Sequence, residues 1–230
     1  GLLTIIWVNI ILSGDNAVVI ALAARSLPQH QQKKAVAWGA GAAVVLRIIL
    51  TIVAVELLKL SFLKLIGAVL LMWIAVKLLV PEDGEEDGVE SSDNLFAAIK
   101  TILIADLVMS LDNVLAVAAA AKGNDTLLII GLAVSIPLVI FGATVLMKLM
   151  ERFPIIITLG AAILGWVSGE MAITDPAVSQ WINDNAAWLH YLAPAVGAAL
   201  VVIIGKALAR RAEATHKDEV VDLASEEPKS

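Results

Sequence analysis

The sequence contains no cysteine, only 5% aromatic residues and only 17% charged residues. Without cysteine, disulfide bonds, thiolate metal sites and thiol chemistry are excluded. No basic stretch interleaved with aromatic residues indicates a nucleic-acid partner. The sequence also lacks a Walker A motif, a nucleophile elbow and a glycine-rich dinucleotide motif, so nothing in it indicates ATP use, an organic cofactor or an enzyme.

Hydrophobic residues, in contrast, make up 60% of the 230 residues. A soluble fold of this size could not bury so much apolar surface. Because a helix needs roughly 20 apolar residues to cross the bilayer, the pattern predicts an all-α polytopic membrane protein with seven transmembrane helices. They are expected at residues 2–24, 35–58, 62–80, 95–121, 126–149, 155–173 and 188–208.

The distribution of Lys and Arg predicts the orientation of these helices. One set of helix ends carries twelve basic residues, and the opposite set carries only Lys59, Lys64 and Lys122. Since basic residues are retained on the cytoplasmic side, we expect a multi-pass protein of the plasma (inner) membrane, with its amino terminus outside and its carboxyl terminus in the cytoplasm. Trp181 and Trp188 then fall near the outer interface.

An internal repeat divides the chain. Residues 11–18 (ILSGDNAV) align without gaps on 108–115 (VMSLDNVL), residues 67–73 align on 160–166, and Gly39 pairs with Gly131. The repeat predicts two three-helix units, and an odd number of helices gives the second unit the opposite direction in the membrane. In transporters with such inverted repeats, the substrate site lies near the midplane between the repeats.

The predicted organisation follows from this repeat and from the charged segments between the helices. It comprises the first repeat at 1–80, an acidic cytoplasmic loop at 81–93, the second repeat at 94–174, an extracytoplasmic loop at 175–187, a seventh helix at 188–209 and a charged, disordered cytoplasmic tail at 210–230.

The repeated motif places Asp15 and Asp112 inside two predicted helices, and Asp106 adds a third acid. A carboxylate at the bilayer centre costs at least about 2.5 kcal/mol, so each must face a cavity, a partner or an ion. Asn9 stands where the second repeat has Asp106, so the charge is not symmetric. Hydrogen bonding between helices is the structural alternative, but three acids favour an ion or proton pathway.

The candidate metal ligands are nearly all oxygen donors, which suit a hard divalent cation such as Mn²⁺, Mg²⁺ or Ca²⁺. Met109 would favour Mn²⁺ if its thioether faces the site, and otherwise it is a packing residue. The complete set of candidates is Ser13, Asp15, Asn16, Asp106, Met109, Ser110, Asp112 and Asn113.

Other charged residues lie in or near the predicted spans. Arg47, inside the second helix, is either a counter-charge that neutralises the acids when the site is empty or a fixed salt-bridge partner. Glu56 and Glu170 are either part of a cation pathway or ordinary interfacial charges.

The sequence resembles the TerC family of integral membrane proteins, and within it the short bacterial YjbE-type branch of metal transporters. The resemblance rests on residues 14–23 (GDNAVVIALA), 105–116 (ADLVMSLDNVLA) and 151–154 (ERFP), and it covers most of residues 2–173. It implies manganese export, membership of the lysine-exporter-like superfamily, and metal-binding acids at Asp15, Asp106 and Asp112.

We therefore expect a secondary transporter that exports divalent cations, most plausibly Mn²⁺, as its substrate. The alternative is a membrane accessory protein that supplies metal to exported enzymes or works with the secretion machinery. Transport of Ca²⁺, protons or a tellurium oxyanion is a third interpretation, although the acids disfavour an anion. The residues leave open the transport direction, proton coupling and assembly into a homo-oligomer.

Overall fold

The computed structural model describes residues 14–57, 60–80, 91–121 and 125–225, without the side chains of 52–57, 91–93, 112–121, 125–135, 213 and 215–225. These ranges contain helices and no strands, which confirms the all-α prediction. The helices are α2 (Gly14–Ala24), α3 (Gln29–Leu57), α4 (Leu63–Leu79), α5 (Ser91–Ala121), α6 (Asp125–Arg152), α7 (Ile155–Ile173), α8 (Ser179–Asn185) and α9 (Leu189–Ser225).

Within the described ranges, four helical segments are long and apolar enough to cross a membrane. They are Gln29–Thr51, Asn94–Leu111, Ile155–Ile173 and Leu189–Ala212, and α2 is a shorter apolar helix. The predicted first helix begins at residue 2, so most of it lies outside the described residues. The count of seven spans therefore stays a prediction, and the chain is described here as a helical protein with several membrane-spanning segments.

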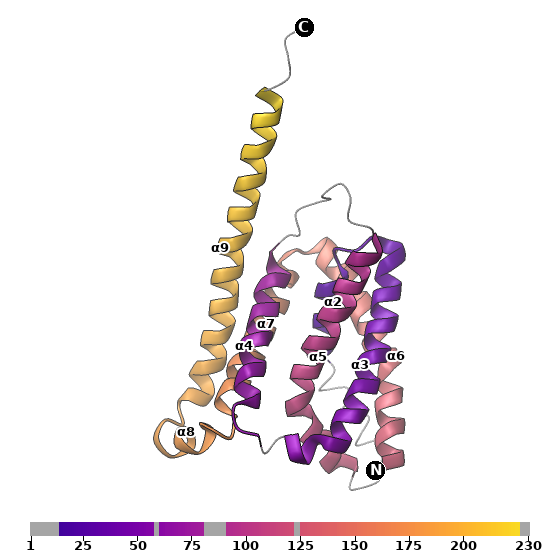
Figure 1. The fold of residues 1–230 in the computed structure, drawn as a ribbon, viewed down its shortest axis with the longest axis vertical. Helices are drawn as coiled ribbons and strands as arrows, with labels where there is room; N and C mark the ends of the chain where they lie inside the picture. The colour runs from indigo at the N-terminus through magenta and orange to yellow at the C-terminus, as the bar shows by residue number, and fades with distance from the viewer. Residues whose placement is uncertain (1–13, 58–59, 81–90, 122–124, 226–230) are drawn as a thin grey trace.

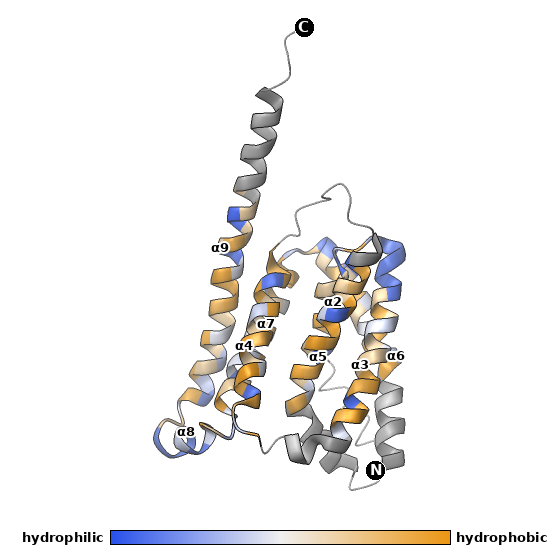
Figure 2. Cartoon of the chain, in the orientation of Figure 1, coloured by the Kyte–Doolittle hydropathy of each residue, from blue (hydrophilic) through white to orange (hydrophobic). Residues whose placement is uncertain are grey.

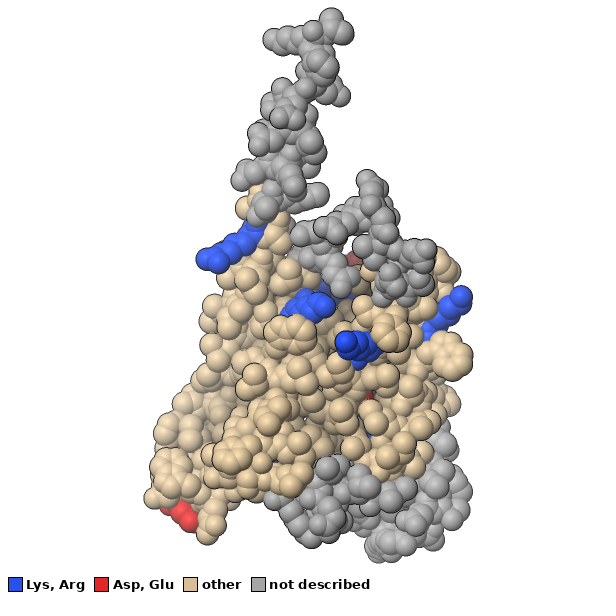
Figure 3. All heavy atoms as spheres, in the orientation of Figure 1, with Lys and Arg blue, Asp and Glu red and all other residues tan. Residues whose placement is uncertain are grey.

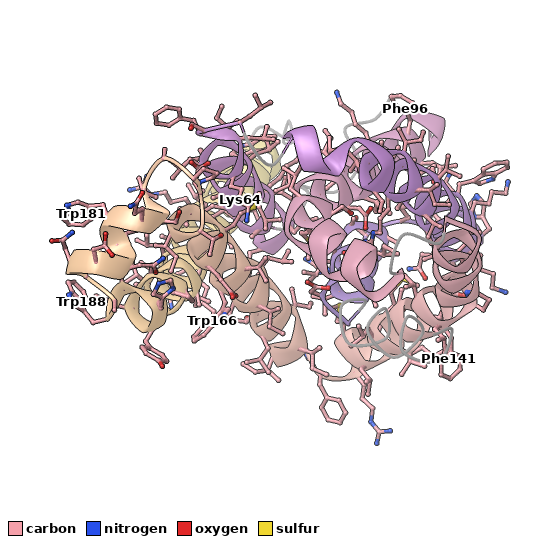
Figure 4. All side chains as sticks on the ribbon, turned by 90° about the horizontal axis from the view of Figure 1, so that it is seen from below. Lys64, Phe96, Phe141, Trp166, Trp181 and Trp188 are labelled. Atoms are coloured by element: carbon pink, nitrogen blue, oxygen red, sulfur yellow. The ribbon has the colours of Figure 1, made fainter. Side chains whose placement is uncertain are left out.

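The outer surface of the helices is apolar. Val69 on α4, Phe96 on α5 and Phe141 on α6 are each at least 70% exposed, and Figure 4 shows that Phe96, Phe141 and Trp166 point away from the bundle. Figure 2 shows hydrophobic residues along the middle of the helices, with hydrophilic residues gathered near their ends. A surface of this kind is stable against lipid rather than water, as expected for a multi-pass membrane protein.

The helices pack in two groups (Figure 1). In the first, α3 lies along α5, and α2 contacts both α5 and α6. In the second, α7 packs against both α4 and α9, which also contact each other. Smaller contacts of α4 with α5 and of α2 with α7 join the groups. Most of the candidate site residues lie in the first group.

Glycines allow the backbones of α7 and α9 to touch. A Cβ added at Gly165 would lie only 2.5 Å from the carbonyl oxygen of Gly197, and one added at Gly169 would collide with the backbone of Ala193. Small residues at such positions let membrane helices approach closely, and dispersion contacts then replace the missing hydrophobic driving force. The position of α9 beside α7 therefore depends on these glycines.

Two segments after α7 contain helix that the hydropathy pattern did not predict. Residues 210–225, predicted as part of a disordered tail, instead continue α9 to Ser225. The segment is rich in Ala, Arg, Glu and Lys, which are strong helix formers, and it has no Gly or Pro before residue 228. The predicted extracytoplasmic loop contains the short helix α8, whose exposed Trp181 points outward (Figure 4).

Asp175 connects the segment after α7 to the start of α4. Its side chain is fully buried. Its Oδ1 accepts hydrogen bonds from the backbone N–H groups of Phe62 and Ala177, at 2.9 and 2.8 Å, and its Oδ2 accepts from those of Lys64 and Leu65, at 3.0 and 3.2 Å. The first N–H groups of a helix have no partner within the helix, and here an acid more than a hundred residues away supplies one.

The hydrogen bonds determine the charge state of this carboxyl group. Burial by itself raises the pKa of Asp175, but the four backbone donors, on Ala177, Phe62, Leu65 and Lys64, outweigh it and hold the pKa below its ordinary value of 3.8. A carboxyl group with a lowered pKa stabilises the fold above its unfolded-state pKa, and this contribution is lost as the pH falls through the folded-state pKa.

We expect Asp175→Asn to lower the free energy of unfolding at pH 7 by about 2 kcal/mol, because a neutral amide is a weaker acceptor for these four donors. Thermal unfolding of the purified protein in detergent, compared between pH 7 and pH 3, measures the effect. The difference between wild type and variant should shrink at the lower pH. Asp184→Asn, on an exposed part of α8, is the matched control, and an equal loss in both variants would contradict the assignment.

Candidate functional site

Arg47 lies in the middle of α3 and is buried, with 3% of its surface exposed. A guanidinium keeps its charge at any physiological pH, so within an apolar helix it needs an anionic partner close by. Its Nη2 forms an ion pair with Oδ1 of Asp106 on α5, and its Nε donates a hydrogen bond to Ser110 Oγ at 3.0 Å. The planar guanidinium therefore joins α3 to α5 through two neighbouring donors.

Asp106 and Ser110 share a face of α5 because they are four residues apart. Both are buried, Asp106 at 6% exposure and Ser110 at 0%. The Ser110 hydroxyl donates to Oδ2 of Asp106 at 3.2 Å. Each carboxylate oxygen of Asp106 thus has its own donor, which is the condition under which a buried charge is tolerated.

Asp15, at the start of the described part of α2, is half-buried and completes the described part of the site. Its Oδ1 accepts a hydrogen bond from the backbone N–H of Asn16 at 2.8 Å. Asp15 lies within electrostatic range of the Arg47 guanidinium, which attracts its carboxylate, and of the Asp106 carboxylate, which repels it. Three charged groups from three helices therefore form one cluster inside the bundle, and we call Asp15, Arg47, Asp106 and Ser110 the Arg47 cluster.

The other candidates whose side chains are described lie around or away from this cluster. Asn16 is 3% exposed on α2. Met109 is also buried and packs in the hydrophobic core. Glu170 is exposed on α7, which belongs to the other group of helices. The structure thus brings together Asp15, Asp106, Ser110 and Arg47, and it leaves Glu170 outside.

Four candidates cannot be placed. Ser13 lies outside the described residues, and the side chains of Glu56, Asp112 and Asn113 do too, although α3 and α5 include their backbone. Among the side chains that are described, no three His, Cys, Asp or Glu residues come together in a way that could hold a metal ion. This part of the site holds two carboxyl groups and one guanidinium.

The sequence left open whether Arg47 contacts the acids, and it did not reveal two buried hydroxyl contacts, one beside Arg47 and one in the second helix group. Thr51, one turn after Arg47, donates its hydroxyl to the Arg47 carbonyl oxygen at 2.7 Å. Ser168 on α7 donates to the carbonyl oxygen of Ala68 on α4, also at 2.7 Å. In both cases the sequence shows only a hydroxyl residue within an apolar helix, and this does not identify the acceptor of its hydrogen bond.

The chain is similar in sequence to known integral membrane proteins. The profile described as "Integral membrane protein TerC family" matches residues 1–213. The uncharacterized membrane protein YjbE of Bacillus subtilis (strain 168) is 40% identical over 202 residues, which cover 88% of this chain and 92% of the relative. The uncharacterized membrane proteins YceF and YkoY of the same organism are 28% and 26% identical and cover 70% and 75% of this chain. No solved structure matches the chain.

The pairing of Arg47 with Asp106 predicts strong coupling between the two residues. Arg47→Met leaves the Asp106 carboxylate buried without its counter-charge, so we expect a loss of about 3–5 kcal/mol in unfolding free energy. The double variant Arg47→Met/Asp106→Leu removes both charges and should lose less than either single variant. Unfolding of the purified proteins in detergent measures all three. Losses that simply add would show that the two charges do not depend on each other.

Proposed function

Because the chain belongs to the TerC family of integral membrane proteins, we propose that it is a secondary transporter that exports divalent metal cations, with Mn²⁺ as the preferred substrate. The family is associated with metal ion transport rather than with an enzymatic reaction. The observation that carries the proposal is the Arg47 cluster, where Asp106 of α5 pairs with the Arg47 guanidinium and Asp15 of α2 lies within electrostatic range of both.

The excess of acid is the first argument for a cation. A pair that only holds helices together needs one carboxylate for one guanidinium, and Asp106 already supplies it. Asp15 adds a second carboxylate that interacts with both members of the pair, and Asp112 would add a third from the same helix as Asp106. Extra carboxylates within a membrane are costly unless a cation or a proton balances them.

The chemistry of the ligands is the second argument. Carboxylate, amide and hydroxyl oxygens suit Mn²⁺, Mg²⁺ and Ca²⁺. We propose Asp15, Asp106 and Asp112 as the ligands that bind the cation, with oxygen atoms of Ser110, Asn16, Ser13 and Asn113 completing the site. The burial of Met109 in the hydrophobic core supports a packing role for that residue, so the preference for Mn²⁺ rests on the family resemblance.

Arg47 supplies the counter-charge of the empty site in this proposal. With both acids ionised and Arg47 paired with Asp106, the described cluster carries a net charge of −1. A divalent cation that displaces the guanidinium brings the two carboxylates to neutrality, and Arg47 returns to Asp106 after the cation leaves. The exchange keeps Asp106 from being buried without a partner at any stage.

The packing of the helices supports a midplane site between inverted repeats. Suppose that α2, α3 and α4 correspond to α5, α6 and α7. A two-fold axis would then relate the contact of α3 with α5 to the contact of α6 with α2, and both contacts are present. The third helices, α4 and α7, contact each other, as expected for elements on either side of such an axis. Sites in transporters of this architecture lie where the two repeats meet.

Charge bears on the orientation of the chain and on its energy source, whereas the direction of transport rests on the family resemblance. Figure 3 shows Lys and Arg side chains toward the end from which α9 projects, which supports a cytoplasmic location of the carboxyl terminus. Moving a divalent cation out of a cell against a potential of 100 mV, negative inside, costs about 4.6 kcal/mol. Export therefore needs a coupled ion, and we propose protons that bind the same carboxylates when the metal has left.

Metal content of cells tests the proposal. Expression of the wild-type chain should lower intracellular Mn under Mn stress, whereas Asp15→Asn, Asp106→Asn and Asp112→Asn should each reduce transport about tenfold or more, because ligand-sphere changes cost about 10–100-fold in metal affinity. Elemental analysis of washed cells and ⁵⁴Mn flux in proteoliposomes measure both effects, and Asp184→Asn on exposed α8 is the matched control.

Unchanged Mn content with wild type and with Asp112→Asn would reject export. Absence of flux in proteoliposomes together with stable co-purification of secretion components would favour the accessory function instead.

The role of Arg47 has a separate test. If Arg47 is a counter-charge, Arg47→Met should bind Mn²⁺ more tightly, because no cation competes for Asp106. It should transport more slowly, because Asp106 in the empty site then has no counter-charge. Electron paramagnetic resonance of free Mn²⁺ measures binding, and flux measures turnover. Arg47→Lys, which keeps the charge, is the control. A fall in both binding and flux would identify Arg47 as a fixed structural partner.

A further inference from the structure

Three exposed aromatic side chains lie on α8 and around the start of α9, at the end of the bundle away from the projecting end of α9 (Figure 1). Trp181 is 62% exposed, Trp188 is 60% exposed and Tyr191 is 81% exposed. We call these three residues the aromatic rim. Large apolar side chains that gather on one surface mark an interaction site, so the rim requires a partner of matching chemistry.

The segment that carries the rim is held against the bundle. Ile182 on α8 is buried, with 5% of its surface exposed. The backbone N–H of Ser179 donates to the carbonyl oxygen of Asp175 at 2.9 Å, and a hydrogen bond of 2.8 Å joins Asn183 Oδ1 to Nε2 of His190 at the start of α9. The aromatic rings therefore project from a fixed support.

Two sides of α8 differ in polarity. Gln180, Asn183 and Asp184 are exposed, and at about 100° per residue they fall within an arc of about 100°, whereas Trp181 lies outside that arc. Seen along the long axis of the molecule, Trp181 and Trp188 stand at the same edge and point away from the bundle (Figure 4), which is the direction of the surrounding lipid. A helix with one polar and one apolar side is typical of the boundary between water and lipid.

The rim continues into the exposed apolar surface of α9. Trp188 and Tyr191 lie at the start of the candidate membrane span Leu189–Ala212, and Val196 and Ile203 are exposed further along that span. Trp and Tyr are enriched where membrane helices meet water, because the body of the ring is apolar while its N–H or O–H reaches polar groups. This continuity favours lipid over another protein as the partner of the rim.

The charge of the segment bears on which lipid it fits. Residues 153–205 contain no Lys or Arg, so this part of the chain has no side-chain cation that would attract an anionic headgroup. Asp184 is exposed on α8 and would repel one. The rim is therefore suited to the boundary that all phospholipids share, and not to the selection of one headgroup.

We propose that α8 lies in the membrane surface on the side away from the projecting end of α9, with the aromatic rim inserted at the boundary between the headgroups and acyl chains of that leaflet. Trp181, Trp188 and Tyr191 contact lipid, and the polar side of α8 faces water. Because Asp175 also ties this segment to the start of α4, the rim sets the depth of α4, α7 and α9 together.

Spin labelling tests this placement, because the chain has no cysteine and a single introduced one is labelled alone. Nitroxides at Trp181→Cys, Trp188→Cys and Asp184→Cys are compared in the full chain, in phosphatidylcholine vesicles with and without phosphatidylglycerol. Collisions with oxygen, which enters lipid, and with a water-soluble nickel chelate report the depth of each label. We expect the labels at 181 and 188 about 5–10 Å inside the headgroup boundary, the label at 184 in water, and equal depths in both lipid mixtures.

A second set of variants tests the rings themselves. With the nitroxide at Ala187→Cys, an exposed position between the two tryptophans, Trp181→Ser/Trp188→Ser should move the label toward water, whereas Trp181→Tyr/Trp188→Tyr should leave its depth unchanged. Trp38→Ser is the matched control, because Trp38 is an exposed tryptophan on α3. Equal effects of the serine changes at the rim and at Trp38 would show that the rim does not anchor α8.

Three outcomes of the first experiment would overturn the proposal. Labels at 181 and 188 that are as accessible to the nickel chelate as the label at 184 would show that the rim is free in water. Spin–spin broadening that disappears on dilution with unlabelled chain would identify a second copy as the partner. Insertion that occurs only with phosphatidylglycerol would show that headgroup charge, and not the aromatic rings, determines binding.

Discussion

The pairing of Arg47 with Asp106 is the interaction on which the arrangement of the first helix group depends. Neither charge can remain alone inside a membrane protein without a large free-energy cost, so α3 and α5 must adopt the register that brings them together. Ser110 reinforces that register, since it contacts Arg47 and Asp106 at once. Asp15 is then held beside the pair by α2, and the site is a consequence of this one constraint.

The second helix group is held by a different kind of contact. Between α7 and α9, glycines bring one backbone against the other, and between α4 and α7 the Ser168 hydroxyl bonds to the backbone of Ala68. Asp175 then fixes the start of α4 to the segment that follows α7. Charge organises the group that contains the candidate site, whereas close packing and backbone hydrogen bonds organise its neighbour.

Hydropathy was enough to predict an all-α membrane protein and the approximate range of α7, because a long apolar run has few other stable structures in a bilayer. The acids of the candidate site stand out as charges in an apolar sequence, and their role as ligands stays a prediction. Their partners were not. The ion pair of Arg47 joins residues 59 apart in sequence, and Asp175 reaches residues more than a hundred positions away, so both depend on how the helices pack. The extension of α9 to Ser225 was missed because charge was taken to indicate disorder, although the same residues favour helix.

The backbone contact between α7 and α9 also has a mechanical consequence. A layer of side chains between two helices can compress or change rotamer when one helix shifts, but Gly165 and Gly197 leave no such layer. A displacement of α9 must therefore reach α7 almost undiminished, and α7 is packed against α4. The helices α4, α7 and α9 therefore form one rigid unit. The more deformable contacts are the smaller ones of α4 with α5 and of α2 with α7, which join this unit to the first helix group.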